Sequence, residues 1–260
     1  MLDALAVTKN TITLLLSLDA LDKAWAERAR KVLARVDLRL GSQLRGEKAS
    51  LLRGLYVILD PQVAQRDILE VAAAALRGGA KALQLRDKLH EKGDQLPTAL
   101  RLKDLCAQHN ALLFINDHAD LAAASGAHGL HIGQHDLPLA DARRLLSPAQ
   151  LIGRSNATLE EALASQAQGA DYIAVGSIFP TATKERTRPA GLETLRQVKK
   201  AAQVPVVAIG GINETNVDQV LDAGADAIAV ISAVLASPDP QAAARRLAER
   251  IASALAHRQG

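Results

Sequence analysis

Residues 55–86 read LYVILDPQVAQRDILEVAAAALRGGAKALQLR and contain one complete folding unit. Leu55–Asp60 is a short apolar run that predicts a strand, Ile68–Leu76 has helical periodicity, and Ala82–Arg86 predicts a second strand. The pair Gly79–Ala80 ends the helix, because glycine readily takes the left-handed conformation that follows a helix C-terminus. A strand, a helix and a second strand in this order predict two parallel strands joined by a crossover helix.

The same unit recurs along the chain, and glycine–alanine pairs end three further helical patterns at 126–127, 169–170 and 224–225. Each strand pattern is followed by a longer helical pattern rich in alanine and leucine. The strand patterns are Leu55–Asp60, Ala82–Arg86, Leu112–Asn116, Gly129–Ile132, Leu151–Ser155, Tyr172–Ser177, Val206–Ile209 and Ala227–Ile231. Their number and order predict an α/β fold, a (β/α)8 TIM barrel, which we assign to residues 54–260.

Residues 1–53 lie outside this pattern, and we predict that they form an N-terminal helical extension with a linker. Apolar residues at intervals of three and four predict one long amphipathic helix: Leu18, Leu21, Trp25, Ala29, Val32, Val36 and Leu40. The polar stretch Gly41–Ser50 predicts the linker. An apolar stripe must be buried, which leaves two interpretations. The helix covers the bottom or a flank of the barrel, or it forms an interface with a partner or a second copy.

The composition is that of an ordinary globular protein. Hydrophobic residues make up 48% and charged residues 23%, and the formal net charge is only +3. Because basic and acidic residues are interleaved, we predict no nucleic-acid surface. Cys106 is the only cysteine, which excludes an internal disulfide and a cysteine-based zinc site. Ile12–Leu18 is too short to cross a membrane and lacks a signal cleavage site, so we predict a cytoplasmic protein without membrane association.

Charged and amide side chains follow the second strand of the predicted barrel. Catalytic groups of such barrels lie at the C-terminal ends of the strands. The alternation of a strand places Gln84, Arg86 and Lys88 on the same side. Interior positions of a barrel are normally apolar, so two cations and an amide here indicate a site for a multiply charged phosphate.

Aspartates follow the third and fourth strands, at Asp117 and Asp136. Neighbouring strand ends lie close together, and Mg²⁺ prefers one or two carboxylates together with phosphate oxygens and water. We therefore predict that the two aspartates share Mg²⁺. Two alternatives are that both cap the following helices, or that His131 and His135 bind zinc.

The last strands predict a second anion site. The seventh strand ends in Gly210–Gly211 directly before a helix, and the eighth ends in Ile231–Ser232 before a short helical stretch. Loops in these places form the phosphate site of many barrels, because backbone N–H groups and glycine allow close approach of the anion. The long loop 178–189, rich in hydroxyls and cations, is a candidate lid, with a solvated loop as the alternative. Together the two sites favour a reaction that joins a diphosphate to a monophosphate.

These motifs resemble the thiamine-phosphate synthase family over about residues 54–256. The matching motifs are residues 84–88 (QLRDK), 116–117 (ND), 131–136 (HIGQHD), 180–184 (PTATK), 210–212 (GGI) and 231–233 (ISA). The resemblance implies Mg²⁺ at Asp117 and Asp136 and catalytic roles for Arg86, Lys88, Lys184 and Ser155. It implies an aminopyrimidine diphosphate site at Gln84, Arg86, Lys88, Asn116, Ser155 and Lys184. It also implies a thiazole phosphate site at Thr181, Ala182, Thr183, Gly210, Gly211, Ile231 and Ser232.

The implied reaction displaces pyrophosphate from the aminopyrimidine methylene carbon by the thiazole nitrogen. The chain departs from the family at three positions. A small residue is common in the family at the position of Asn156, a histidine at that of Ala157, and an acidic residue at that of His135. Three alternatives are a thiazole tautomerase, a regulatory barrel that binds thiamine phosphates, and a phosphate-binding barrel of tryptophan synthesis. The sequence is also compatible with a homo-oligomer.

Overall fold

The computed structural model describes residues 2–17, 22–181 and 188–258. From Gly54 onward, parallel strands form a closed barrel in the order β1 to β8, and β8 pairs with β1. The strands are β1 Gly54–Leu59, β2 Ala82–Leu85, β3 Leu112–Asn116, β4 Gly129–Ile132, β5 Leu151–Asn156, β6 Tyr172–Val175, β7 Val206–Ile209 and β8 Ala227–Val230. The (β/α)8 fold class is confirmed, and each strand begins and ends within two residues of its predicted bounds.

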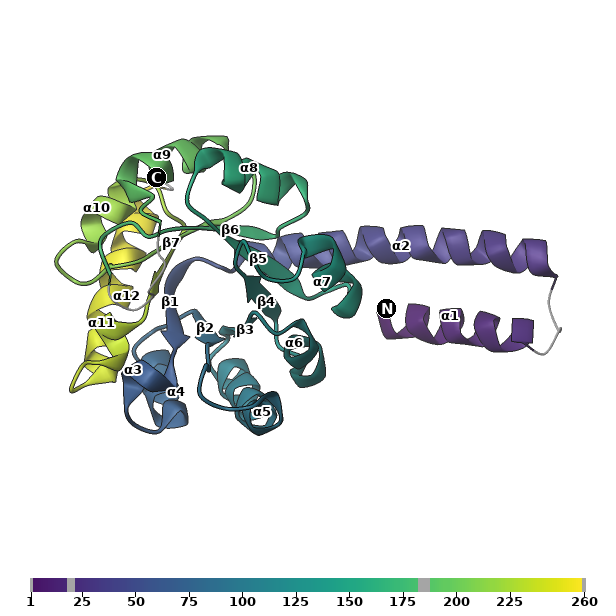
Figure 1. Cartoon of the computed structure of the whole chain (residues 1–260), viewed down its shortest axis with the longest axis horizontal. Coiled ribbons are helices and arrows are strands. Elements are labelled where there is room, and N and C mark those ends of the chain that lie inside the picture. The colour runs from purple at the N-terminus through teal and green to yellow at the C-terminus, as the bar shows by residue number, and fades with distance from the viewer. Residues whose placement is uncertain (1, 18–21, 182–187, 259–260) are drawn as a thin grey trace.

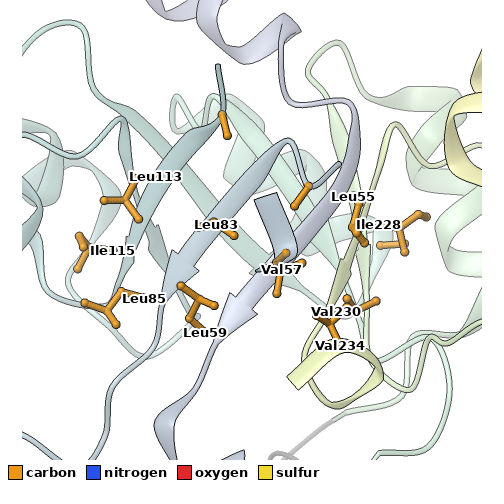
Figure 2. Close-up of a cluster of buried hydrophobic side chains, with 14 of the residues drawn as sticks. Leu55, Val57, Leu59, Leu83, Leu85, Leu113, Ile115, Ile228, Val230 and Val234 are labelled. Carbon is orange, nitrogen blue, oxygen red and sulfur yellow. The ribbon is translucent and has the colours of Figure 1, made fainter. Parts of the chain in front are cut away.

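Helices surround the barrel on the outside (Figure 1). They are α3 Pro61–Ala64, α4 Ile68–Arg77, α5 Lys92–Gln108, α6 Ala119–Ser125, α7 Leu139–Leu145, α8 Leu159–Ala167, α9 Gly191–Ala201, α10 Val217–Asp222, α11 Ser232–Leu235 and α12 Pro240–His257. Alternate residues of each strand point to opposite faces of the sheet. One set belongs to a buried cluster that also contains residues of the helices. Figure 2 labels members of this cluster on β1, β2, β3 and β8, together with Val234 of α11: Leu55, Val57, Leu59, Leu83, Leu85, Leu113, Ile115, Ile228 and Val230.

The other set fills the interior of the barrel, where three aromatic rings pack together. The ring centroid of Phe114 lies 5.4 Å from that of Tyr56 and 5.2 Å from that of Tyr172. Glycines on the adjacent strands make room for these rings. A Cβ atom at Gly153 would lie 1.8 Å from Cζ of Tyr172, and one at Gly129 would lie 2.7 Å from Cε1 of Phe114. The barrel interior is therefore filled by aromatic side chains on some strands that occupy the space left by glycines on the neighbouring strands.

The N-terminal extension is a pair of helices that projects from the barrel (Figure 1). Helix α1 spans Leu2–Ser17 and α2 spans Lys23–Ser50, with Asp22 as its N-cap. The predicted linker Gly41–Ser50 is wrong, because these residues form the last turns of α2. The residues from Leu18 to Leu21, which begin the predicted stripe, lie outside the described part of the chain.

The C-terminal turns of α2 are bound to the base of the barrel by polar contacts. Arg45 forms an ion pair with Asp171 at 3.0 Å, and the Lys48 ammonium donates to the carbonyl of Ala149 at 2.7 Å. A Cβ atom at Gly41 would lie 2.8 Å from the carbonyl oxygen of Pro148, so glycine allows the close approach. Leu52 follows and is buried among the interior residues of the barrel. The helix therefore covers the barrel only with its end, and no helix within the described ranges is long and apolar enough to span a bilayer.

Candidate functional site

A cavity of about 240 Å³ opens at the C-terminal ends of β4 to β8. Of the predicted site residues, it is lined by Ser155, Thr181, Gly210, Gly211, Ile231 and Ser232. A second hollow shares Thr181, Gly211 and Ser232 with it and extends to Asp60 at the end of β1. The strand ends therefore bring together residues that are far apart in the sequence, as the barrel prediction required.

The turn after β7 needs both of its glycines. Gly210 has φ 103° and Gly211 has φ 65°, values that disfavour side chains. A Cβ atom at Gly210 would lie 2.6 Å from Cβ of Ser177, and one at Gly211 would lie 2.6 Å from the carbonyl oxygen of Pro180. The turn packs against the loop after β6, where the amide of Phe179 donates to the carbonyl of Gly210 at 3.0 Å. This contact brings backbone from two loops to the cavity wall.

A cluster of charged residues lies at the ends of β2, β3 and β4. The Lys88 ammonium donates to Asp117 at 2.6 Å. Asp117 has φ 62°, a left-handed conformation that is uncommon for a residue with a side chain and is often found at functional sites. Asp136 accepts from the amide of Gly133 at 2.6 Å. The carboxyl groups of Asp117 and Asp136 are also close enough to share a hydrogen bond.

The two carboxyl groups have opposite pKa shifts. Burial acts to raise the pKa of Asp117, but the hydrogen bonds from Lys88 and Asp136 outweigh it and hold that pKa below its usual range. Burial and the neighbouring Asp117 carboxylate raise the pKa of Asp136. Two adjacent carboxylates repel each other, and a divalent cation bound between them would relieve this repulsion. This donor set fits Mg²⁺, which needs few protein ligands.

The alternative roles for these residues do not agree with the structure. The residues at the N-caps of α6 and α7 are His118 and Pro138, so neither aspartate caps a helix. In the described part of the chain, no three histidine, cysteine, aspartate or glutamate side chains are grouped as a metal site, which leaves zinc at His131 and His135 without support.

Arg86 and Gln84 have partners that the sequence did not reveal. Arg86 forms an ion pair with the buried Asp60 at the end of β1. Gln84 lies inside the barrel and donates to the hydroxyl of Tyr56 at 2.8 Å. Asn116 is also buried. Only Lys88 of the predicted trio is substantially exposed, with 39% of its side chain accessible. The positive charges of the predicted diphosphate site are therefore balanced by carboxylates on neighbouring strand ends.

A chain of buried hydrogen bonds crosses the barrel from Gln84 to Ser155. The hydroxyls of Tyr56 and Tyr172 are 3.3 Å apart, Tyr172 lies 2.9 Å from Nδ1 of His131, and Nε2 of His131 lies 2.9 Å from Oγ of Ser155. Burial raises the pKa of both tyrosines, so both remain hydrogen-bond donors.

Starting from the Gln84 amide, one direction of donation satisfies every group of this chain. With the Gln84 amide as donor to Tyr56, every group is satisfied when Tyr56 donates to Tyr172 and Tyr172 donates to Nδ1 of His131. In this arrangement Nε2 of His131 carries the hydrogen and donates to Ser155, and the serine hydroxyl hydrogen is left to be donated into the cavity. Sequence reasoning missed the tyrosines because they lie inside the strands and not at their ends.

Comparison with known proteins gives the family. A family model described as thiamine monophosphate synthase matches residues 55–234. The thiamine-phosphate synthase of Methanospirillum hungatei is 46% identical over 198 residues, which is 75% of this chain and 96% of that protein. The chain belongs to the thiamine-phosphate synthase family. The synthase of Albidiferax ferrireducens is 49% identical over 199 residues, covering 76% of this chain and 91% of that protein.

A solved structure agrees with this membership. The thiamine phosphate pyrophosphorylase from Pyrococcus furiosus superposes with a TM-score of 0.74 at 38% identity, covering 80% of this chain and 98% of that one. The function and enzyme class predicted from the resemblance, a transferase that synthesises thiamine phosphate, are confirmed. The tautomerase, regulatory and tryptophan-synthesis alternatives are not favoured.

At Asn156 the departure from the synthase family has a local structural role. Asn156 is buried, its amide oxygen accepts from Gln134 at 3.0 Å and from Ser165 at 2.7 Å, and its amide nitrogen donates to the carbonyl of Arg154 at 2.8 Å. These bonds tie the end of β5 to β4 and α8. Ala157 and His135 line the cavity.

The loop after β6 is described at its two ends only. The predicted contacts Ala182, Thr183 and Lys184 lie outside the described residues. At the far end of the loop, Arg188 lines the cavity and pairs with Glu161 at 2.6 Å. Its backbone carbonyl accepts from the amide of Ser177 at 3.1 Å. Arg188 is therefore a cation of the cavity to which the sequence analysis gave no role.

Proposed function

We propose that the chain binds an aminopyrimidine diphosphate and a thiazole phosphate side by side at the barrel mouth and joins them. The observation that carries this proposal is that two different sets of groups suited to anions lie at neighbouring strand ends. A cation and carboxylate cluster lies at β1 to β4, and a backbone turn with a cavity lies at β7 and β8. The shared hollow from Asp60 to Ser232 supports contact between the two sites.

The charged cluster is the proposed diphosphate site. Asp117 and Asp136 would hold Mg²⁺, which would supply positive charge to the leaving pyrophosphate. Arg86 and Lys88 add two further cations, and Lys184 has the same role by resemblance. Because Lys88 is already hydrogen-bonded to Asp117, its ammonium is oriented before substrate arrives. Fixed positive charge aimed at a developing anion is the main source of catalysis expected here.

The cavity is the proposed place of bond formation. Ser155 donates its hydroxyl hydrogen to the aminopyrimidine, and the turn at Gly210 and Gly211 holds the thiazole phosphate together with Thr181 and Ser232. The C–O bond between the pyrimidine methylene and the diphosphate breaks, pyrophosphate leaves with the electron pair, and the thiazole nitrogen forms the new C–N bond. Alignment of the two substrates replaces a covalent enzyme intermediate.

The test is direct synthesis by the purified chain. Protein, Mg²⁺, aminopyrimidine diphosphate and thiazole phosphate are mixed, and thiamine phosphate is measured as fluorescent thiochrome after oxidation. Product that requires all of these components supports the proposal. Absence of product from folded protein that still binds thiazole phosphate, measured by calorimetry, would contradict it.

A further inference from the structure

An apolar stripe on α2 is left uncovered by the described part of the chain. Trp25, Val32 and Val36 are 48%, 57% and 39% exposed. Their spacing of seven and four residues places them on one face of the helix, with the half-buried Ala29 between them. The family match begins at residue 55, so this surface lies outside the part of the chain that matches the synthase family.

The spacing of the stripe is that of a two-helix seam. In heptad notation Trp25, Ala29, Val32 and Val36 occupy positions d, a, d and a. Helix α1 does not fill this seam, because it packs on the adjacent face of α2. There Ala26 is fully buried and Arg30 donates to the hydroxyl of Thr13 at 3.2 Å. A stripe of a and d positions alone has the width of one partner helix.

Basic residues flank the seam on the side away from α1. Arg28 and Arg35 occupy the two g positions beside the stripe, Arg39 occupies the next d position and ends the stripe, and all three are exposed. Residues 23–40 contain six basic and two acidic residues, whereas the net charge of the whole chain is only +3. Side chains at the flanking positions select the partner of a coiled coil by charge. The complementary helix must therefore be acidic beside its apolar residues.

A second copy of the chain does not meet this requirement. In an antiparallel pair of α2 helices the g positions face each other, so Arg28 and Arg35 would meet like charges. In a parallel pair they would face the e positions, where Ala26 is already covered by α1.

A membrane surface fits poorly as well. Among the α1 side chains that the structure describes, the large apolar ones that are exposed are Val7 and Leu14, which lie about 200° around the helix from the buried Ile12 and do not extend the stripe.

We propose that this face of α2 binds an amphipathic helix of another protein, with apolar residues in heptad spacing and acidic residues beside them. Trp25 is the only tryptophan of the chain, so its fluorescence reports directly on the surface. The probe is a synthetic three-heptad peptide with Leu at a and d and Glu at e and g. The matched peptide has Lys at e and g. Both are titrated into the full chain.

The charge-reversed variant gives the decisive comparison. The acidic peptide is expected to shift the Trp25 emission to shorter wavelength and to bind at least tenfold more tightly than the basic peptide. Arg28→Glu with Arg35→Glu is expected to reverse this preference. The control, Arg101→Glu with Arg196→Glu on exposed positions of α5 and α9, is expected to keep it. Circular dichroism, measured in parallel, shows that each variant keeps the helix content of the full chain.

Three results would overturn the proposal. The first is equal binding of the two peptides, or no binding of either. The second is a shift of Trp25 emission with phosphatidylglycerol vesicles but not with the acidic peptide, which would assign the face to a membrane. The third is a dimer in light scattering that Val32→Ser dissociates, which would assign it to a second copy.

Discussion

Nε2 of His131 lies 2.9 Å from Oγ of Ser155, and this contact connects the cavity to the buried tyrosines. Tyr172→Phe removes the hydrogen-bond partner of Nδ1 of His131, so the orientation of the Ser155 hydroxyl is no longer set. We expect KM for the aminopyrimidine diphosphate to rise about tenfold, equivalent to about 1.4 kcal/mol, with little change in KM for thiazole phosphate. Steady-state kinetics with each substrate varied in turn measures this difference.

A double-mutant cycle separates this effect from a general loss of stability. Ser155→Ala combined with Tyr172→Phe should cost little more than Ser155→Ala alone, because both act through one chain of hydrogen bonds. Independent, additive effects of the two substitutions would show that Tyr172 does not act through Ser155.

Asp117→Asn should abolish the stimulation of synthesis by Mg²⁺. The substitution keeps the size of the side chain but removes the charge that pairs with Lys88 at 2.6 Å. We expect kcat to fall about 100-fold or more, the size found when one group that stabilises a developing charge is removed. Rates measured across a Mg²⁺ titration test this. The control is Asp120→Asn in the adjacent helix α6, where Asp120 pairs with Lys92 at 2.8 Å; a similar loss there would argue against a specific role for Asp117.

Gly211→Ala should weaken thiazole phosphate binding and destabilise the fold. Its φ of 65° and the 2.6 Å approach to the carbonyl oxygen of Pro180 leave no place for a methyl group. We expect a loss of about 1–3 kcal/mol in the free energy of unfolding. Denaturation and calorimetry with thiazole phosphate measure the two effects. Gly46→Ala is the control, because no atom lies within 4 Å of a Cβ there and alanine is favoured inside a helix.

The stability of the fold should fall in mild acid because of His128. Burial, together with Lys48 and Lys103, lowers the pKa of His128 to about 4. Its Nδ1 accepts from the amide of Leu113 at 2.9 Å, which requires the neutral ring. The unfolded chain takes up this proton near pH 6.5, so stability is complete above that pH and is lost as the pH falls towards 4. We expect the free energy of unfolding to fall by on the order of 2–3 kcal/mol over this range.

Urea denaturation at pH 7.5 and pH 5 measures this contribution. His128→Gln should reduce the difference in unfolding free energy between the two pH values. His257→Gln, at the exposed end of α12, is the matched control. An unchanged difference in the His128 variant would mean that other groups cause the acid sensitivity.

Removal of the projecting helices should leave the chemistry intact, whereas removal of their attachment to the barrel base should lower the stability of the barrel. A chain that begins at Gly41 keeps Arg45, Lys48 and Leu52 against the barrel base. We expect its kcat to stay within about twofold of the full chain, since a surface change far from the site has little effect. A chain that begins at Gly54 leaves Asp171 with one ion-pair partner fewer and opens the barrel interior, so its Tm should be lower. Equal Tm values for the two truncated chains would show that the contacts of Arg45, Lys48 and Leu52 with the barrel base do not stabilise the barrel.

The sequence predicted the barrel because its strands and helices have distinct local periods. Leu55 and Val57 alternate with Tyr56 and Ile58, and the structure places the two sets on opposite faces of the sheet. The polar stretch Gly41–Ser50 was misassigned because a helix that binds by Arg45 and Lys48 has the composition of a solvated linker. Those contacts join residues more than 100 positions apart, and local patterns do not contain them.

The sequence predicted the candidate site residues that lie at the ends of strands, but not those that lie inside the barrel. Asp117 and Asp136 follow strands, so their position alone predicted them as metal ligands. Tyr56 and Tyr172 are 116 residues apart, and each alone is typical of a barrel core. Only closure of the barrel brings the two hydroxyls together, so their shared role depends on three-dimensional packing.

Gly153 and Tyr172 occupy what is effectively one volume, since a Cβ atom at the glycine would lie 1.8 Å from the tyrosine ring. Any side chain at residue 153 would overlap the ring of Tyr172 and force it to move. A second substitution that places a smaller residue at position 172 removes this overlap. Evolutionary substitutions at residues 153 and 172 are therefore coupled. A chain that acquires a side chain at residue 153 can keep its barrel only by losing the aromatic ring at residue 172, and with it the buried hydroxyl.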